Sequence, residues 1–193
     1  VGVVAEGKYL TRNGVKDPAA IFEREIGENL WIKKHLEPGE QVGKHFVTSE
    51  YTFRSEYCAE EGLLLVGDAF GFLDPVFSSG LLLALKSGVM AAENVDRALS
   101  EGNLKPSQFG AYADVMIQGT ENMRKLVYAF YNPDFSFKDL TEKHPDLAGD
   151  VTDCLSGDVN KDFSRLWDAI RDFAPLPDEL PYGVPGPTAE ATV

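Results

Sequence analysis

A single carboxylate beside a glycine turn is the first feature of this chain that could do chemistry. Asp68 follows the apolar run 63–66, and Gly67 between them allows a sharp turn. A short apolar run bracketed by glycines predicts a strand covered on both faces, as in a parallel sheet. Open α/β sheets bind ligands at the carboxyl ends of their strands. We therefore expect Asp68 to accept hydrogen bonds from the hydroxyl groups of a ligand.

The segment from Pro75 to Gly80 predicts a helix start that favours a negatively charged ligand. Pro75 fixes its own backbone, and Ser78 or Ser79 can cap the helix that follows. Gly80 removes a side chain where the first amides of the helix point outward. Those unpaired amides and the positive end of the helix dipole attract negative charge.

The helix that begins near Gly80 is expected to pack against the core and to end at Gly102 and Asn103. Lys86 lies on it, and we expect that lysine to be a surface residue. The apolar residues that recur at helical spacing are Leu81, Leu82, Leu83, Leu85, Val89, Met90, Ala92, Val95 and Leu99.

Residues 67–80 read GDAFGFLDPVFSSG, and this string resembles the second flavin-contact motif of FAD-dependent halogenases and halogenase-like flavin monooxygenases. Geranylgeranyl reductases are related, but they more often have a glycine-rich version of the second half of the motif. The resemblance implies that Asp68 contacts the ribityl chain of FAD. It also implies that residues 75–80 lie beside the isoalloxazine ring and help to shape a halide or oxygen site. The cofactor-binding residues implied in this way are Gly67, Asp68, Pro75, Ser78, Ser79 and Gly80.

The same resemblance implies a mixed α/β fold, namely the C-terminal half of a Rossmann-type FAD-binding fold. In it, the strand-turn-helix flavin motif is followed by an α-helical C-terminal region. The chain contains no GxGxxG, the glycine loop that receives the FAD pyrophosphate in such folds. In the family this loop and the catalytic lysine of halogenases come earlier in the sequence. We therefore expect the chain to be a fragment of a larger enzyme that is inactive and holds FAD weakly when alone.

The resemblance and the composition shifts divide the chain into four regions. Residues 1–50 are expected to be the end of a substrate-binding sheet region with helices, and residues 51–104 the C-terminal part of the FAD-binding domain. Residues 105–173 are expected to form the helical C-terminal region. The proline-rich residues 174–193 predict an extended, poorly packed tail.

Both strands and helices are predicted in the first region. Residues 1–5 are expected to be the tail of a strand, and Asp17 with Pro18 predicts a helix start. A second short helix is expected over residues 31–36, and strands over residues 41–55. The candidates for the inward face of those strands are Val42, Phe46, Val47, Tyr51 and Phe53.

The link into the motif strand carries two further expectations. Residues 58–62 are expected to be a polar connector. Arg54 is interpreted either as a partner of the cofactor phosphates or ribityl chain, or as one half of a surface salt bridge.

The later part of the chain predicts helices. A long helix is expected from Pro106 to about Tyr131, where Asn132 and Pro133 stop it, and two shorter helices are expected near 147–155 and 162–173. An aromatic cluster accompanies the long helix, and it is interpreted either as core packing or as an apolar wall for an aromatic substrate. Its members are Tyr128, Phe130, Tyr131, Phe135 and Phe137.

Composition excludes several classes of function. The formal net charge of −13 disfavours nucleic acid and anionic membrane surfaces as partners, and no apolar run reaches membrane-spanning length. Cys58 and Cys154 are expected to be reduced thiols of a cytoplasmic protein, since no signal peptide is visible. The three histidines show no metal-ligand spacing, so no metal site is expected.

Three functions remain open at this point. The first is a halogenase-like flavin monooxygenase that acts on an aromatic or other electron-rich small molecule, with a possible halide and a separate flavin reductase. The second is a flavoenzyme that reduces isoprenoid double bonds, as geranylgeranyl reductases do. The third is a non-catalytic helical interaction module. Because a half-sheet exposes unpaired edges, self-association is also possible.

Overall fold

The structure is a computed structural model that describes residues 1–48 and 52–186. The chain forms two compact units, Val1–Ser49 and Glu50–Val193. In the described part of the chain, no helix combines the length and apolar character that a membrane crossing needs.

The first unit is helical. Asp17 caps one helix by accepting a hydrogen bond from the amide of Ala20 at 2.9 Å, which confirms the predicted start. Asn29 caps the next in the same way, through the amide of Ile32 at 3.1 Å. The elements are α1 (Gly7–Leu10), the 3₁₀ turn η1 (Arg12–Gly14), α2 (Pro18–Glu28) and α3 (Leu30–Leu36).

The strands expected in this unit do not form. Residues 1–5 and 41–48 are irregular, and Val42 and Phe46 are 94% and 92% exposed. Val47, also expected inside, is exposed as well. An apolar alternation needs a partner edge before it becomes a strand, and the described residues of this unit contain none. Tyr51 lies outside the described residues.

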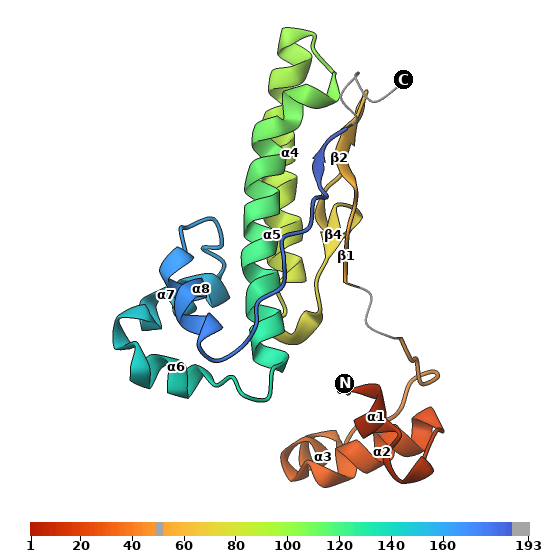
Figure 1. Cartoon of the computed structure of the whole chain (residues 1–193). Helices are drawn as coiled ribbons and strands as arrows, with labels where there is room; N and C mark the ends of the chain where they lie inside the picture. The colour runs from red at the N-terminus through yellow and green to blue at the C-terminus, as the bar shows by residue number, and fades with distance from the viewer. Residues whose placement is uncertain (49–51, 187–193) are drawn as a thin grey trace. The chain divides into compact units, whose positions relative to one another are not determined.

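The second unit is a mixed α/β structure, as expected. Its strands are short, and two long helices, each of 22 residues, dominate it (Figure 1). The strands are β1 (Phe53–Arg54), β2 (Tyr57–Glu60), β3 (Leu63–Leu64), β4 (Gly71–Phe72) and β5 (Val184–Pro185). The helices are α4 (Gly80–Glu101), α5 (Gly110–Tyr131), α6 (Phe137–Lys143), α7 (Ala148–Ser156) and α8 (Ser164–Arg171). The 3₁₀ turns are η2 (Gly67–Ala69), η3 (Pro75–Phe77), η4 (Pro106–Phe109) and η5 (Pro145–Leu147).

The strands make two small sheets. One pairs β1 with β4 antiparallel, and the other has the order β3-β2-β5, in which β2 runs antiparallel to β3 and parallel to β5. The predicted strand 63–66 is therefore wrong in detail: β3 covers only Leu63 and Leu64, its pairing is antiparallel, and Leu63 is 52% exposed. The predicted connector 58–62 is wrong too, because Cys58 lies in β2 and is fully buried.

Helix α4 has the predicted end but not the predicted burial. Gly102 ends it in the left-handed conformation, and the amide of Asn103 bonds the carbonyl of Ala98. Only one face of α4 packs, against α5 and η2. The first half of the helix carries apolar residues on more than one face, and a second row of apolar side chains expected in the core stays exposed: Leu81, Leu85, Val89, Ala92 and Leu99.

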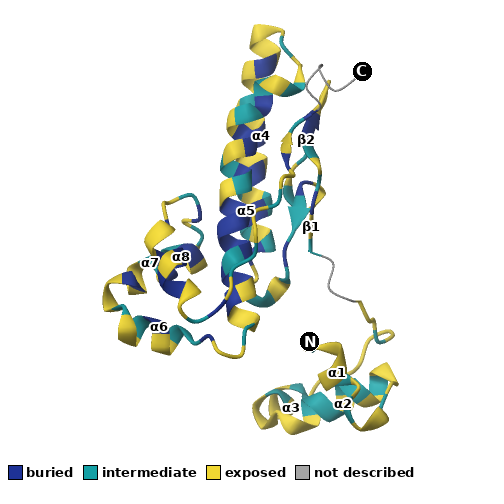
Figure 2. Cartoon of the chain, viewed as in Figure 1, coloured by how far each residue is buried: buried dark blue, intermediate teal, exposed yellow. Residues whose placement is uncertain are grey.

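Helix α5 is the spine of the second unit, and buried residues run along its length (Figure 2). Its first half packs with the sheet and α4 around Tyr112 and Met116. Its second half packs with α6, α7 and α8 around Met123 and Leu126. The long helix to Tyr131 is confirmed, and so are helices in the two shorter regions predicted after it.

The C-terminal segment is extended, as predicted, but its described part is not poorly packed. It runs along α5 to the sheet, where Val184 and Pro185 pair with β2 (Figure 1). Ala174 is 2% exposed, and a Cβ on Gly183 would lie 3.0 Å from the ring of Phe70. The tail is held by long-range pairing, which its proline content does not reveal.

Candidate functional site

The glycine turn before Asp68 is fastened to helix α4. Gly67 has φ 52°, and a Cβ there would lie 3.3 Å from the Cβ of Ala84. The Gly67 amide donates to Oγ of Ser87 at 2.9 Å, and that hydroxyl donates to the carbonyl of Ala84 at 3.0 Å. Ser87 is fully buried. Glycine is therefore required here both for its backbone and for close packing.

Helix α5 holds the segment just before this turn. The hydroxyl of Tyr112 donates to the carbonyl of Leu65 at 2.7 Å. Tyr112 is fully buried, and this burial raises its pKa to about 12. The Asp68 side chain, by contrast, is exposed and has no partner in the described part of the protein. It is thus a free acceptor on a fixed turn.

Asp74 organises the second predicted segment. Its carboxylate accepts from the amide of Val76 at 3.0 Å and so caps η3. The same Oδ1 accepts from the hydroxyl of Tyr131 at 2.9 Å, and the Asp74 amide donates to Oγ1 of Thr52 at 3.0 Å. Pro75 therefore begins a turn that is held on one side by Thr52, which precedes β1, and on the other by the end of α5.

The predicted serine caps do not form. Ser79 precedes α4 but has helical backbone angles, φ −75° and ψ −15°, and its side chain makes no capping hydrogen bond. Ser78 is in the left-handed region at φ 54° and is exposed. A cap needs an extended backbone to bring its oxygen to the first amides. Helix α4 therefore starts without a side chain on its first amides.

The two segments meet on the first turns of α4. Gly80 begins the helix and Gly67 packs on Ala84, four residues later, which corresponds to about 6 Å along the axis. A Cβ on Gly80 would meet nothing within 4 Å. The exposed carboxylate of Asp68 can accept hydrogen bonds from hydroxyl groups, and the uncapped, open start of α4 can donate them to the polar edge of a ring. These residues therefore fit a flavin.

Arg54 neither contacts a cofactor position nor forms a surface salt bridge, the two roles expected from the sequence. Its side chain is buried and donates to Oε1 of Glu121 at 2.7 Å and to the carbonyl of Leu180. Burial lowers the pKa of the guanidinium, and the charge of Glu121 opposes that shift. Arg54 therefore belongs to a buried ion pair and is not available to a cofactor.

Lys86 and the two thiols, Cys58 and Cys154, are also withdrawn from solvent in part or in full. Lys86 is half-buried and donates to Oδ1 of Asn160 at 2.6 Å, so the expected surface position is wrong. Cys58 and Cys154 are free thiols, as expected, and both are buried, which raises their pKa values to about 11 and about 12. Within residues 1–48 and 52–186, no three His, Cys, Asp or Glu side chains gather into a possible metal site.

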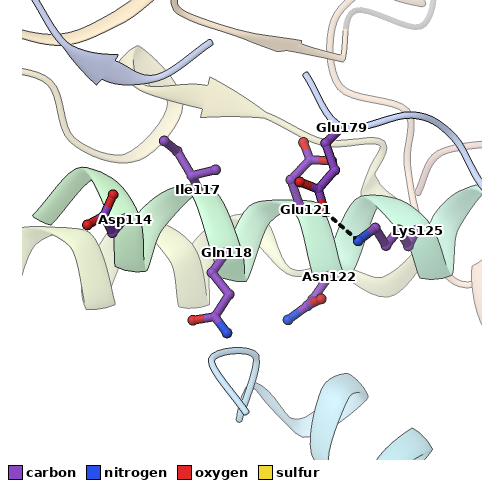
Figure 3. Close-up of a pocket in the computed structure, with 7 residues that line it drawn as sticks. All are labelled: Asp114, Ile117, Gln118, Glu121, Asn122, Lys125 and Glu179. Atoms are coloured by element: carbon purple, nitrogen blue, oxygen red, sulfur yellow. Dashed lines mark hydrogen bonds and ion pairs between the residues drawn. The ribbon is translucent and has the colours of Figure 1, made fainter. Parts of the chain in front are cut away.

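A separate cavity of about 230 Å³ opens beside α5 (Figure 3). Lys125 and Glu179 form an ion pair of 2.9 Å across it, and the other charged side chains of its lining are acidic. None of the six predicted flavin residues lines it. Its lining residues are Asp114, Ile117, Gln118, Glu121, Asn122, Lys125 and Glu179.

The residues that position the site were not predicted from the sequence. Ser87, Tyr112 and Tyr131 hold the two segments through contacts 20, 47 and 57 residues away along the chain. Ser87 and Tyr112 were visible in the sequence only as helix residues, and Tyr131 only as a member of the aromatic cluster; nothing in the spacing marks their hydroxyls as partners of the motif.

Comparison with known proteins points to one family. The model of the tryptophan halogenase family matches residues 40–141, more than half of the chain. A 1H-pyrrole-2-carbonyl-[peptidyl-carrier protein] brominase from Pseudoalteromonas luteoviolacea is 31% identical over 126 residues, 65% of this chain and 30% of that protein. The corresponding chlorinase from Pseudomonas fluorescens is 27% identical over 160 residues, 82% of this chain and 35% of that protein.

A solved structure agrees with the sequence relatives. The flavin-dependent brominase Bmp2 superposes with a TM-score of 0.66 at 26% identity, over 86% of this chain and 41% of that one. The chain thus spans less than half the length of each of these relatives. The matched residues include the whole motif 67–80 and its supporting helices, and the chain therefore belongs to the tryptophan halogenase family.

Proposed function

We propose that this chain supplies one wall of the FAD and halide site of a flavin-dependent halogenase. The observation that carries the proposal is the folded motif GDAFGFLDPVFSSG. It holds the free carboxylate of Asp68 on a turn that packs against the first turns of α4, close to the uncapped start of that helix. The relatives named as flavin-dependent halogenases and the brominase structure support it. Residues 51–104 are the proposed C-terminal part of the FAD-binding domain.

Each predicted site residue has a proposed task. Asp68 accepts hydrogen bonds from the ribityl hydroxyls, and Gly67 keeps the turn narrow enough for the ligand to approach. Ser79 and Gly80 present main-chain amides at the positive end of α4, where a halide ion or the polar edge of the ring is stabilised. Ser78 contributes its exposed hydroxyl, because its own amide already donates to the carbonyl of Pro75 at 2.8 Å. Pro75 fixes the entry to that turn.

When bound and reduced, FAD would give two electrons to molecular oxygen, and the oxygen reduced in this way would take two more electrons from a halide ion, which yields water and an electrophilic halogen species. The task of this chain is to place the halide and the ring edge together and to limit water around them. The proposed substrate is an electron-rich ring, since two relatives are named for a pyrrole carried by a peptidyl-carrier protein. The proposed setting is the cytoplasm, with a separate flavin reductase delivering reduced FAD.

The test uses the whole protein that contains this chain. It is supplied with FAD, a flavin reductase with its nicotinamide, oxygen, and either bromide or chloride. A panel of phenol, indole, pyrrole and pyrrole-2-carbonyl carrier protein is then analysed by mass spectrometry. The expected result is a halide-dependent product with the bromine or chlorine isotope pattern, absent when halide or FAD is omitted.

A different outcome would favour another function. Saturation of a prenyl double bond under anaerobic conditions, without any halogenated product, would support the reductase. Absence of FAD binding by the whole protein would support a non-catalytic module. Either result would overturn the proposal.

A further inference from the structure

The turn that leads into α4 has a backbone that needs outside support. Ser78 has φ 54° and ψ 32°, the left-handed region that residues with a side chain adopt only at a cost. Ser78 is one of two described non-glycine residues with a positive φ. Such a conformation persists when the surrounding structure fixes it. The question is which groups fix this turn.

Asp74 is the local anchor. Its Oδ1 accepts from the amide of Val76 inside the turn, at 3.0 Å. Its own amide donates to Oγ1 of Thr52, at 3.0 Å, which ties it to the segment beside β1. Asp74 is thus tied to Thr52 through its main chain and to the turn through its carboxylate, so it can set the direction of the turn, provided that its side-chain rotamer is fixed.

The end of α5 fixes that rotamer. The Tyr131 hydroxyl donates to Oδ1 of Asp74 at 2.9 Å, the same oxygen that caps the turn. The preceding residue, Phe130, packs its ring edge-on against Phe77 of the turn, with centroids 5.3 Å apart. Two consecutive residues of α5 thus hold the carboxylate before the turn and the ring within it.

We propose that Tyr131 is a positioning residue, which acts through Asp74 to hold the 75–80 turn in the form that binds halide. This inference rests on the proposed function for its final step. Tyr131 does not itself touch the ligand. Removing its hydroxyl leaves the Asp74 carboxylate held only by the Val76 amide, so the strained turn samples other backbone conformations.

The first test needs no catalytic activity. Amide hydrogen exchange of the peptide that covers residues 73–80 is measured for the wild-type protein and for Tyr131→Phe. The phenylalanine keeps the ring, so the fold is retained. We expect exchange in this peptide to rise about fivefold, the factor that loss of one hydrogen bond gives.

The control lies on the same helix. Tyr128 is an exposed tyrosine one turn earlier, and its hydroxyl has no partner in the described structure. Tyr128→Phe should leave exchange in the turn unchanged. Equal exchange in Tyr131→Phe and wild type would overturn the inference, whatever the protein catalyses.

The second test measures halide binding. Bromide is titrated into the FAD-loaded whole protein, and its effect on the flavin absorption spectrum and on KM for bromide is recorded. Tyr131→Phe should raise both the bromide dissociation constant and its KM about fivefold, with kcat at saturating bromide near the wild-type value. Asp74→Asn keeps an acceptor oxygen and should rescue most of the affinity that Asp74→Ala loses.

The outcomes separate the two proposals. If wild type binds and uses bromide while Tyr131→Phe does so equally well, the positioning role is wrong and the function stands. If exchange rises in Tyr131→Phe but wild type shows no response to bromide or chloride, the turn is held as described and the halogenase function is wrong. In that case the proposed effect of Tyr131 on halide binding is wrong as well.

Discussion

Three buried side chains have pKa values well above their usual range. Burial raises the pKa of Cys58 from 9.0 to about 11 and that of Cys154 from 9.0 to about 12. Tyr112 rises from 10.0 to about 12, again because of burial. All three are neutral when protonated, so the folded state keeps protons that the unfolded chain releases at lower pH.

This difference predicts a loss of stability in alkaline solution. Above about pH 9 the unfolded state binds fewer protons than the folded state, so the free energy of unfolding falls with rising pH until the folded pKa values are reached. Urea unfolding at pH 8, 9, 10 and 10.5 should show a steadily lower midpoint. Cys154→Ala should reduce the slope, because one titrating group is gone. A midpoint independent of pH over this range would contradict the burial of these groups.

At the residue scale, the sequence predicted candidate site residues but not the residues that hold them in place. Gly67 and Asp68 stand out because a glycine and a lone acid directly after an apolar run form a compact, polar turn that suits a ligand. The hydroxyls of Ser87, Tyr112 and Tyr131 do not stand out, because a helical serine or tyrosine meets its partner only through tertiary folding. The serine caps failed because Ser79 takes a helical backbone.

At the scale of elements, a buried charge cluster joins the sheet, α5 and the C-terminal segment. Glu121 accepts from Arg54 at 2.7 Å and from Arg124 at 2.6 Å, and the three side chains are between 1% and 6% exposed. The two arginines also donate to the carbonyls of Leu180 and Asp178. Two positive charges therefore share one carboxylate away from water.

Removing that carboxylate charge is expected to be costly. Glu121→Gln leaves two buried guanidinium groups without a counter-charge, and should lower the free energy of unfolding by about 3–5 kcal/mol. The measurement is urea unfolding at neutral pH. The matched control is Asp168→Asn in the other acid–arginine pair at spacing i,i+3, with Arg171, whose side chains are more than half exposed. That change should cost about 0–1 kcal/mol. Similar losses in both variants would contradict the role of burial.

The long helices were predictable from the sequence, whereas the strands were predicted only in part. Local signals mark where helices begin and end, such as Asp17 before α2, Gly102 after α4 and Asn132-Pro133 after α5. Strands need partners, and the partner of β2 includes Val184, more than 120 residues later in the sequence. Of the strands expected over residues 41–55, residues 41–48 are irregular and residues 53–54 form β1, whereas the tail gains order by pairing with β2.

At the scale of the whole molecule, the chain carries part of a family architecture. It spans 41% of the brominase structure and 30% and 35% of the two pyrrole halogenase relatives. The sequence predicted this partial character from the missing GxGxxG loop. It could not predict that α4 would expose Leu81, Leu85 and Val89, because apolar spacing does not say which face meets a partner.

The most direct test of the account is an FAD titration of the whole protein that contains this chain. Wild type should bind FAD with micromolar or tighter affinity. Asp68→Ala should weaken binding about 10- to 100-fold, the effect of losing hydrogen bonds to a charged acceptor. The control Glu93→Ala removes an exposed acid from the middle of α4, away from the motif residues 67–80, and should change nothing. An Asp68→Ala protein that binds FAD as tightly as wild type would contradict the assignment of this turn to the flavin.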